Sequence, residues 1–158
     1  MTSYCVSAYK NPCYGRIEIK TYDLSDNLLY EYKSPNVIVN GARDTLARLL
    51  MGEATDVNNK KISTIKMGTN NTAPDRTQTA LSDTSSVLSL AVSSTLVSGK
   101  PGEVKFTATM DSAVGNEVSY KEVGLFSADN TMFARQIHPT QSKTSDVKLE
   151  YTWIIAFT

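Results

Sequence analysis

The stretch Val147-Lys-Leu-Glu-Tyr-Thr-Trp-Ile-Ile-Ala-Phe157 decides the fold class of this chain. Apolar residues occupy every second position, and Lys148, Glu150 and Thr152 fall between them. Successive side chains of a β-strand point to opposite faces, so this alternation predicts a strand with one buried face. The last third is apolar on both faces, which predicts that this end of the strand is covered from both sides.

The same alternation recurs along the chain and predicts about nine short strands. Turn residues such as 99–102 and 127–130 separate them. We expect the last five strands to form a C-terminal meander. Short strands at regular spacing are typical of a sandwich, so the predicted fold is mainly β, an antiparallel β-sandwich with one short α-helix. The predicted strands cover 15–22, 28–33, 37–39, 62–68, 87–97, 103–110, 117–126, 132–137 and 147–157.

The one helix is predicted at 42–51, where the apolar residues follow a helical period. Asn40 is a residue type favoured at the N-cap, and Gly52 is one that ends helices. We expect this short helix to be amphipathic and to pack on the sheets. Its apolar face would carry Ala42, Leu46, Leu49 and Leu50.

Length and charge restrict the classes of protein. The chain has 158 residues, 16 of them Lys or Arg and 16 Asp or Glu, so its net charge is zero. Proteins that bind nucleic acid usually have a basic excess, so we expect no nucleic-acid partner. No apolar run approaches the roughly 18 residues of a membrane helix, and residues 1–14 lack the pattern of a signal peptide. We expect one sandwich domain over 15–158.

No catalytic constellation is present in the sequence. The single histidine, His138, precedes Pro139, and we interpret it as a rim or turn residue at a strand end. A nucleophile elbow and a phosphate-binding glycine loop are missing. Cys5 and Cys13 are too far from further ligands for a metal site; two free thiols are expected, and a local disulfide stays open. The sequence therefore predicts no enzyme, no cofactor and no metal.

Residues 1–14 are predicted to form an N-terminal assembly arm. The segment has no clean alternation, and Asn11-Pro12 would interrupt a regular strand. Tyrosine covers large contact area at low entropic cost and is enriched at interfaces, so the candidate assembly contacts are Tyr4, Tyr9 and Tyr14. The alternative is that the segment packs on its own sandwich as a first edge strand.

Two parts of the chain resemble small tail-associated proteins of tailed bacteriophages, of the tail-collar fibre and baseplate type. The first is Val37-Ile-Val-Asn-Gly-Ala-Arg-Asp-Thr-Leu-Ala-Arg-Leu-Leu-Met-Gly52, followed by Ile62-Ser-Thr-Ile-Lys-Met-Gly-Thr-Asn-Asn-Thr-Ala-Pro74. The second is Tyr120-Lys-Glu-Val-Gly-Leu-Phe-Ser-Ala-Asp-Asn-Thr-Met-Phe-Ala-Arg135. It resembles a hairpin of those proteins in which Glu, Ile or Val, Gly, Leu, and Phe or Tyr precede an Asp-Gly or Asn-Gly tip. Pro139, Lys143 and Trp153 fit the ending of the same family.

Two departures from the family pattern matter. The hairpin tip is Asp129-Asn130 where members often have Asp-Gly, and Asn tolerates the left-handed backbone that such a turn needs. Collar fibres continue into long shafts, whereas this chain ends at Thr158. We therefore expect a compact accessory subunit rather than a receptor-binding fibre.

The resemblance implies a non-catalytic virion structural protein, used in several symmetric copies. The first hypothesis is a neck, collar or tail accessory subunit, made in the host bacterial cytoplasm and located in the virion. Its partners would be other phage virion proteins and further copies of itself, with no nucleic acid and no membrane. The alternatives are a capsid (head) decoration protein and, from another class, a carbohydrate-binding module.

Overall fold

The computed structural model describes residues 13–53, 57–85 and 87–157. This part of the chain is mainly β, as predicted, and its strands pair antiparallel. The elements are β1 (Cys13–Asp23), β2 (Leu28–Ile38), α1 (Asn40–Leu50), α2 (Val57–Lys60), β3 (Ile62–Gly68), β4 (Leu88–Ala91), β5 (Ser93–Leu96), β6 (Glu103–Met110), β7 (Val118–Ser127), β8 (Met132–Lys143) and β9 (Val147–Phe157).

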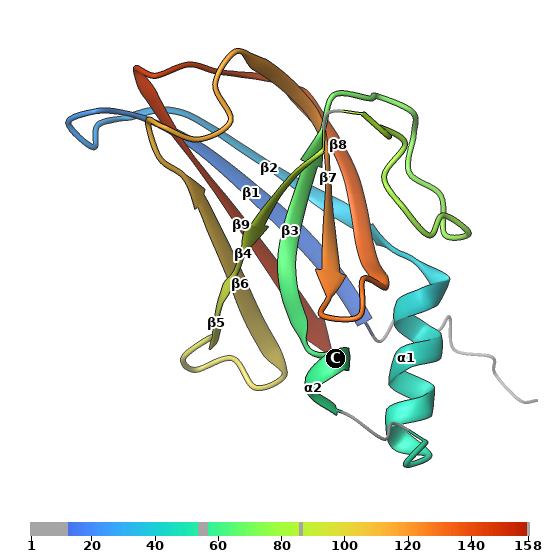
Figure 1. Cartoon of the computed structure of the whole chain (residues 1–158). Coiled ribbons are helices and arrows are strands. Elements are labelled where there is room, and N and C mark those ends of the chain that lie inside the picture. The colour runs from blue at the N-terminus through green and yellow to red at the C-terminus, as the bar shows by residue number, and fades with distance from the viewer. Residues whose placement is uncertain (1–12, 54–56, 86, 158) are drawn as a thin grey trace, which may run out of the picture.

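The strands form one folded sheet in the order β4-β3-β7-β8-β2-β1-β9-β6-β5. Figure 1 shows that it folds into two layers, with β1, β9 and β6 behind β3, β7 and β8. The core lies between the layers and contains Ile17, Leu125 and Trp153, all fully buried. The alternation in β9 therefore identified the buried face correctly. We describe the fold as an antiparallel β-sandwich with a nearly closed sheet.

The strand β2 forms one of the two corners of the sandwich. It pairs with β1 as far as Asn36 and then with β8 through Val37 and Ile38. Asn36 lies over Gly15, where an added Cβ would come within 2.1 Å of the Asn36 Oδ1. The same oxygen accepts a hydrogen bond of 3.1 Å from the Trp153 Nε1. The sequence predicted two strands here, but a single strand changes partner between Asn36 and Val37.

The other corner lies at Val92, inside the segment predicted as one strand over 87–97. The strand β4 pairs with β3, whereas β5 pairs with β6 at the opposite edge of the sheet. Only Val92 separates them, and its N–H donates to the carbonyl oxygen of Ser63. The chain crosses here between the layers, and the crossing nearly closes the sheet.

The predicted C-terminal meander is wrong. The β5–β6 and β7–β8 hairpins are present, but β6 pairs with β9, and β7 pairs with β3. The connections from β6 to β7 and from β8 to β9 therefore join strands that are not neighbours in the sheet. Local alternation identifies a strand and its buried face, but it contains no information on which distant strand lies beside it.

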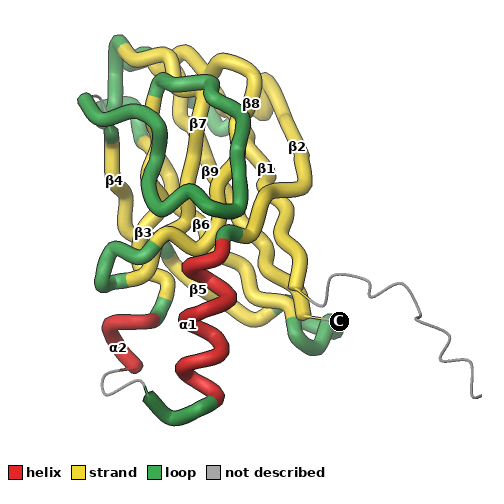
Figure 2. Tube along the Cα trace, turned by 90° about the vertical axis from the view of Figure 1, so that its right-hand side faces the viewer, coloured by secondary structure: helices red, strands yellow, loops and turns green. Residues whose placement is uncertain are grey.

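Helix α1 lies at one end of the sandwich (Figure 2). The predicted N-cap is wrong: the helix begins at Asn40, and the N-cap residue is Val39, without a side-chain hydrogen bond. The predicted end is confirmed. Gly52 has φ +73°, its N–H donates to Leu49 O, and the N–H of Glu53 donates to Arg48 O, a Schellman motif. Within the described residues, no helix is long and apolar enough to cross a bilayer.

Candidate functional site

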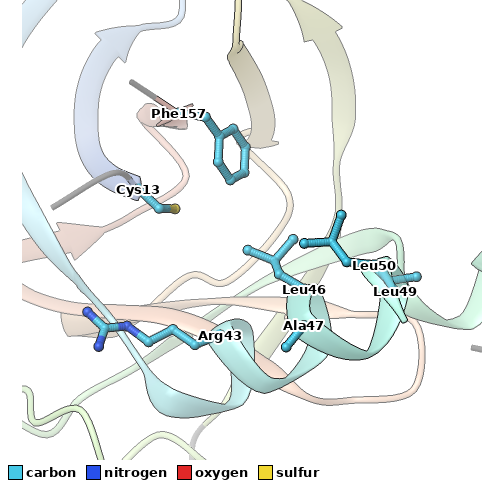
Figure 3. A pocket seen from close by; sticks show the side chains of 7 residues that line it. All are labelled: Cys13, Arg43, Leu46, Ala47, Leu49, Leu50 and Phe157. Atoms are coloured by element: carbon cyan, nitrogen blue, oxygen red, sulfur yellow. The ribbon is translucent and has the colours of Figure 1, made fainter. Parts of the chain in front are cut away.

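An apolar groove lies between α1 and the ends of β1 and β9. Figure 3 shows the Leu46 side chain pointing from the helix toward the ring of Phe157. The groove has a volume of about 780 Å³ and is open to solvent. It is lined by Cys13, Arg43, Leu46, Ala47, Leu49, Leu50 and Phe157.

The groove exists because α1 extends beyond the sandwich. Only Ala42 and Thr45 of this helix are buried, near its N-terminal end. Leu50 is 91% exposed and the next residue, Met51, is 71% exposed. The expectation that α1 packs on the sheets is confirmed for Ala42 and Thr45, whereas Leu46 and Leu49 are only partly covered and Leu50 is exposed. A contiguous exposed apolar surface of this kind typically marks an interaction site.

A smaller opening continues the groove toward the core. It has a volume of about 180 Å³ and shares Leu46, Leu49 and Phe157 with the groove. Its inner wall includes Phe106 and Ile155, which belong to the core between the two layers. An apolar side chain that entered the groove would therefore contact the core of the sandwich as well as the helix.

Few charges are available at the groove for catalysis. Arg43 is the charged residue of the groove lining, and Arg48, on the same helix but not in the lining, forms ion pairs with Asp44 at 2.9 Å and Glu53 at 2.8 Å. Cys13 is half-buried, and burial raises the pKa of its thiol, which leaves less of the reactive thiolate at neutral pH. The groove thus has the chemistry of a binding surface for apolar side chains.

A second exposed apolar surface lies at the turn between β1 and β2. Leu24, Leu28 and Leu29 are all more than half exposed there. The eleven residues of β1 separate this turn from Cys13 at the groove, which corresponds to about 35 Å of extended strand. Figure 1 shows the turn and α1 at opposite ends of the molecule. The described residues therefore form two apolar surfaces that are separate from each other.

The Glu122–Arg135 pair is a fully enclosed ion pair within the described residues, and it organises a long loop. Both side chains are fully buried, and the Arg135 Nη2 lies 2.5 Å from Glu122 Oε2. Glu122 also accepts hydrogen bonds from the backbone N–H groups of Ser82 and Asp83, at 3.0 and 2.6 Å. Arg135 donates to the carbonyl oxygen of Thr72 at 2.9 Å. The pair holds the long loop between β3 and β4 against β7 and β8.

The interpretation of His138 as a rim or turn residue is wrong. The strand β8 continues beyond Pro139 to Lys143, and His138 is buried in it. Burial lowers the pKa of the imidazole, so the ring is neutral at pH 7. Its Nδ1 lies 2.9 Å from Pro139 O, and its ring packs edge-on against Tyr151. The strand accommodates Pro139, which has no N–H to donate, because the pairing of β8 with β7 is interrupted between Tyr120 and Glu122.

The predicted assembly contacts fall only partly within the described residues. Tyr4, Tyr9 and Cys5 lie outside them. Tyr14 is the second residue of β1, pairs with Ala156 and is 40% exposed, but it does not line the groove. The groove residues were identified in the sequence as a helical apolar face and as a strand end, without any sign that they would be uncovered.

The structure brings no metal-binding group together: in 13–53, 57–85 and 87–157, no cluster of three His, Cys, Asp or Glu side chains has a suitable arrangement. Comparison with known proteins gives no relative, since no family model, curated protein or solved structure matches the chain.

Proposed function

We propose that this chain is a non-catalytic structural subunit of a tailed bacteriophage particle, a neck, collar or tail accessory protein that attaches through protein–protein contacts. The observation that carries the proposal is the groove beside α1, where Leu46 and Leu49 are only partly covered and Leu50 is 91% exposed. Burying such apolar surface against a neighbour is the main favourable contribution to protein association.

The two apolar surfaces support a subunit that contacts more than one neighbour. A ring or stack of identical subunits needs two different surfaces on each copy, one for the preceding and one for the following subunit. The groove and the β1–β2 turn lie at opposite ends of β1. This arrangement is compatible with several symmetric copies in one particle.

We propose a phage particle because of the resemblance to tail-associated proteins. In the Glu-Val-Gly-Leu-Phe stretch, Glu122 anchors the loop between β3 and β4, and Asn130 takes φ +67° at the hairpin tip. The residues that carry the resemblance thus have roles in forming the domain. They form the β7–β8 hairpin, and the resemblance places Asn130 where family members often have glycine.

The test is the copy number of the chain in purified particles of the phage that encodes it. We expect on the order of a dozen copies, as for a neck or tail ring with cyclic symmetry. Hundreds of copies would favour a capsid decoration protein. Absence from particles, together with glycan binding by the purified protein, would favour the carbohydrate-binding module and contradict the proposal.

A matched pair of variants links incorporation to the groove. L50D places a charge on the uncovered helix face, where Leu50 is 91% exposed. L96D makes the same change at a leucine that is 82% exposed on β5 and does not line the groove. We expect L50D to reduce the copy number in particles and L96D to leave it unchanged. Equal incorporation of both variants would show that the groove is not the attachment surface.

A further inference from the structure

We propose that the groove beside α1 binds residues 1–12 of a neighbouring copy of this chain. The inference deepens the proposed function and rests on it, because it requires several copies to assemble side by side. It names the occupant of the groove, which would be a peptide segment of the same protein rather than a different subunit.

The composition of residues 1–12 matches the groove. The segment Met-Thr-Ser-Tyr-Cys-Val-Ser-Ala-Tyr-Lys-Asn-Pro contains one charged side chain, Lys10, and no acidic residue. Tyr4, Val6 and Tyr9 supply apolar surface at intervals along it. A segment of this composition fits a groove that is lined mainly by leucines, Ala47 and Phe157, with one charged residue, Arg43, since tyrosine and valine side chains can fill its depressions.

The place where the segment joins the domain brings it to the groove. Residue 12 is bonded to Cys13, and Cys13 itself lines the groove. Twelve extended residues span up to about 40 Å, whereas the eleven residues of α1 have a length of about 16 Å. The segment is therefore long enough to reach an adjacent copy and still follow the full length of its helix.

The proline before β1 is compatible with a segment that reaches a neighbouring copy. Proline at 12 disfavours helical backbone at Asn11. An extended segment can reach the groove of an adjacent copy. Two copies that exchange these segments would cover both grooves at once, and a ring of copies would cover every groove in turn.

The two cysteines provide a direct test with the full-length protein. If a segment lies in its neighbour's groove, its Cys5 comes close to the Cys13 of that neighbour. We would mix C5S and C13S proteins, each with one remaining thiol, and oxidise the mixture with copper phenanthroline. A disulfide-linked dimer that joins one molecule of each variant, identified by mass spectrometry, is the expected product.

Self-association of the unmodified chain supplies the second measurement. We expect light scattering to show oligomers, L50D to weaken their association at least about tenfold, and L96D to leave it unchanged. Monomers throughout, or oligomers that survive L50D and give no mixed disulfide, would overturn the inference. A Cys5–Cys13 disulfide within single wild-type chains, without the mixed dimer, would also overturn it, because the segment would then lie in its own groove.

The outcome can be separated from that of the proposed function. A chain that is incorporated into particles at ring copy number but does not self-associate through the groove leaves the proposed function intact and contradicts the inference. A chain that self-associates through the groove but is absent from purified particles supports the inference and contradicts the proposed function.

Discussion

Glu122 and Arg135 show how a single buried pair can organise a long loop. The two side chains lie on neighbouring strands and are fully buried, and their remaining hydrogen-bonding groups contact the segment between β3 and β4. Burial of the two charges requires desolvation of both, so the pair contributes little net stability while both are present. Removal of one partner alone leaves the other charge buried without a partner, which destabilises the fold.

We predict that R135M destabilises the protein by about 3–5 kcal/mol, because it leaves the Glu122 carboxylate buried without its partner. Urea unfolding followed by tryptophan fluorescence measures the change. The double variant E122Q/R135M is the control, since it removes both charges and should lose less stability than the sum of the single variants. Additive losses would show that the two side chains do not interact energetically.

We predict that the stability decreases as the pH falls below about 6.5, in part because of His138. Burial holds the pKa of the folded imidazole below its ordinary value, so the unfolded chain binds a proton first. The stabilisation from the neutral ring is complete above pH 6.5 and is lost as the pH falls toward the folded pKa, by at most about 1.4 kcal/mol per pH unit. Urea unfolding at pH 7.5 and 5.5 should show a smaller decrease for H138Q than for the wild type. An equal decrease would mean that other groups cause the pH dependence.

At the level of secondary structure, α1 shows that one helix can have two different environments. Its first half contacts β8 and the core, whereas in its second half Leu49 is only partly buried and Leu50 is exposed to solvent. The helical period in the sequence was sufficient to predict the helix and its end at Gly52. It could not show where the covering strands stop, because that depends on residues far away in the sequence.

We predict that L50D changes the free energy of unfolding by less than about 0.5 kcal/mol, as expected for an exposed surface position. Thermal and urea unfolding of the purified variant provide the measurement. The comparison is L49D, because Leu49 is partly buried and lies in the smaller opening toward the core, so its loss should be larger. A strongly destabilised L50D would mean that the second half of α1 is covered within the monomer.

At the level of the whole chain, the two layers form one continuous sheet through the corners at β2 and Val92. We predict that they unfold together in a single transition, as small single domains usually do. The fluorescence of Trp153, buried between the layers, and the far-UV circular dichroism should change at the same urea concentration. Separate midpoints would show that one layer remains folded without the other.

The sequence by itself determined most of the strands and helix α1, but neither α2 nor the part of β8 beyond Ile137. Alternation identified the strands and placed Trp153 in the core, and helical spacing with Gly52 identified α1. These features depend on residues within a few positions of each other, so a local pattern is sufficient to predict them.

Only the tertiary structure determined which strands are neighbours, and this pairing determines which residues are buried and which line the groove. Pairing of β6 with β9 and of β7 with β3 replaced the predicted meander, and the crossing at Val92 divided one predicted strand into two. The same long-range arrangement buried His138 and left Leu50 uncovered. Burial depends on which distant segments pack against a residue, and neither residue's local sequence contains that information.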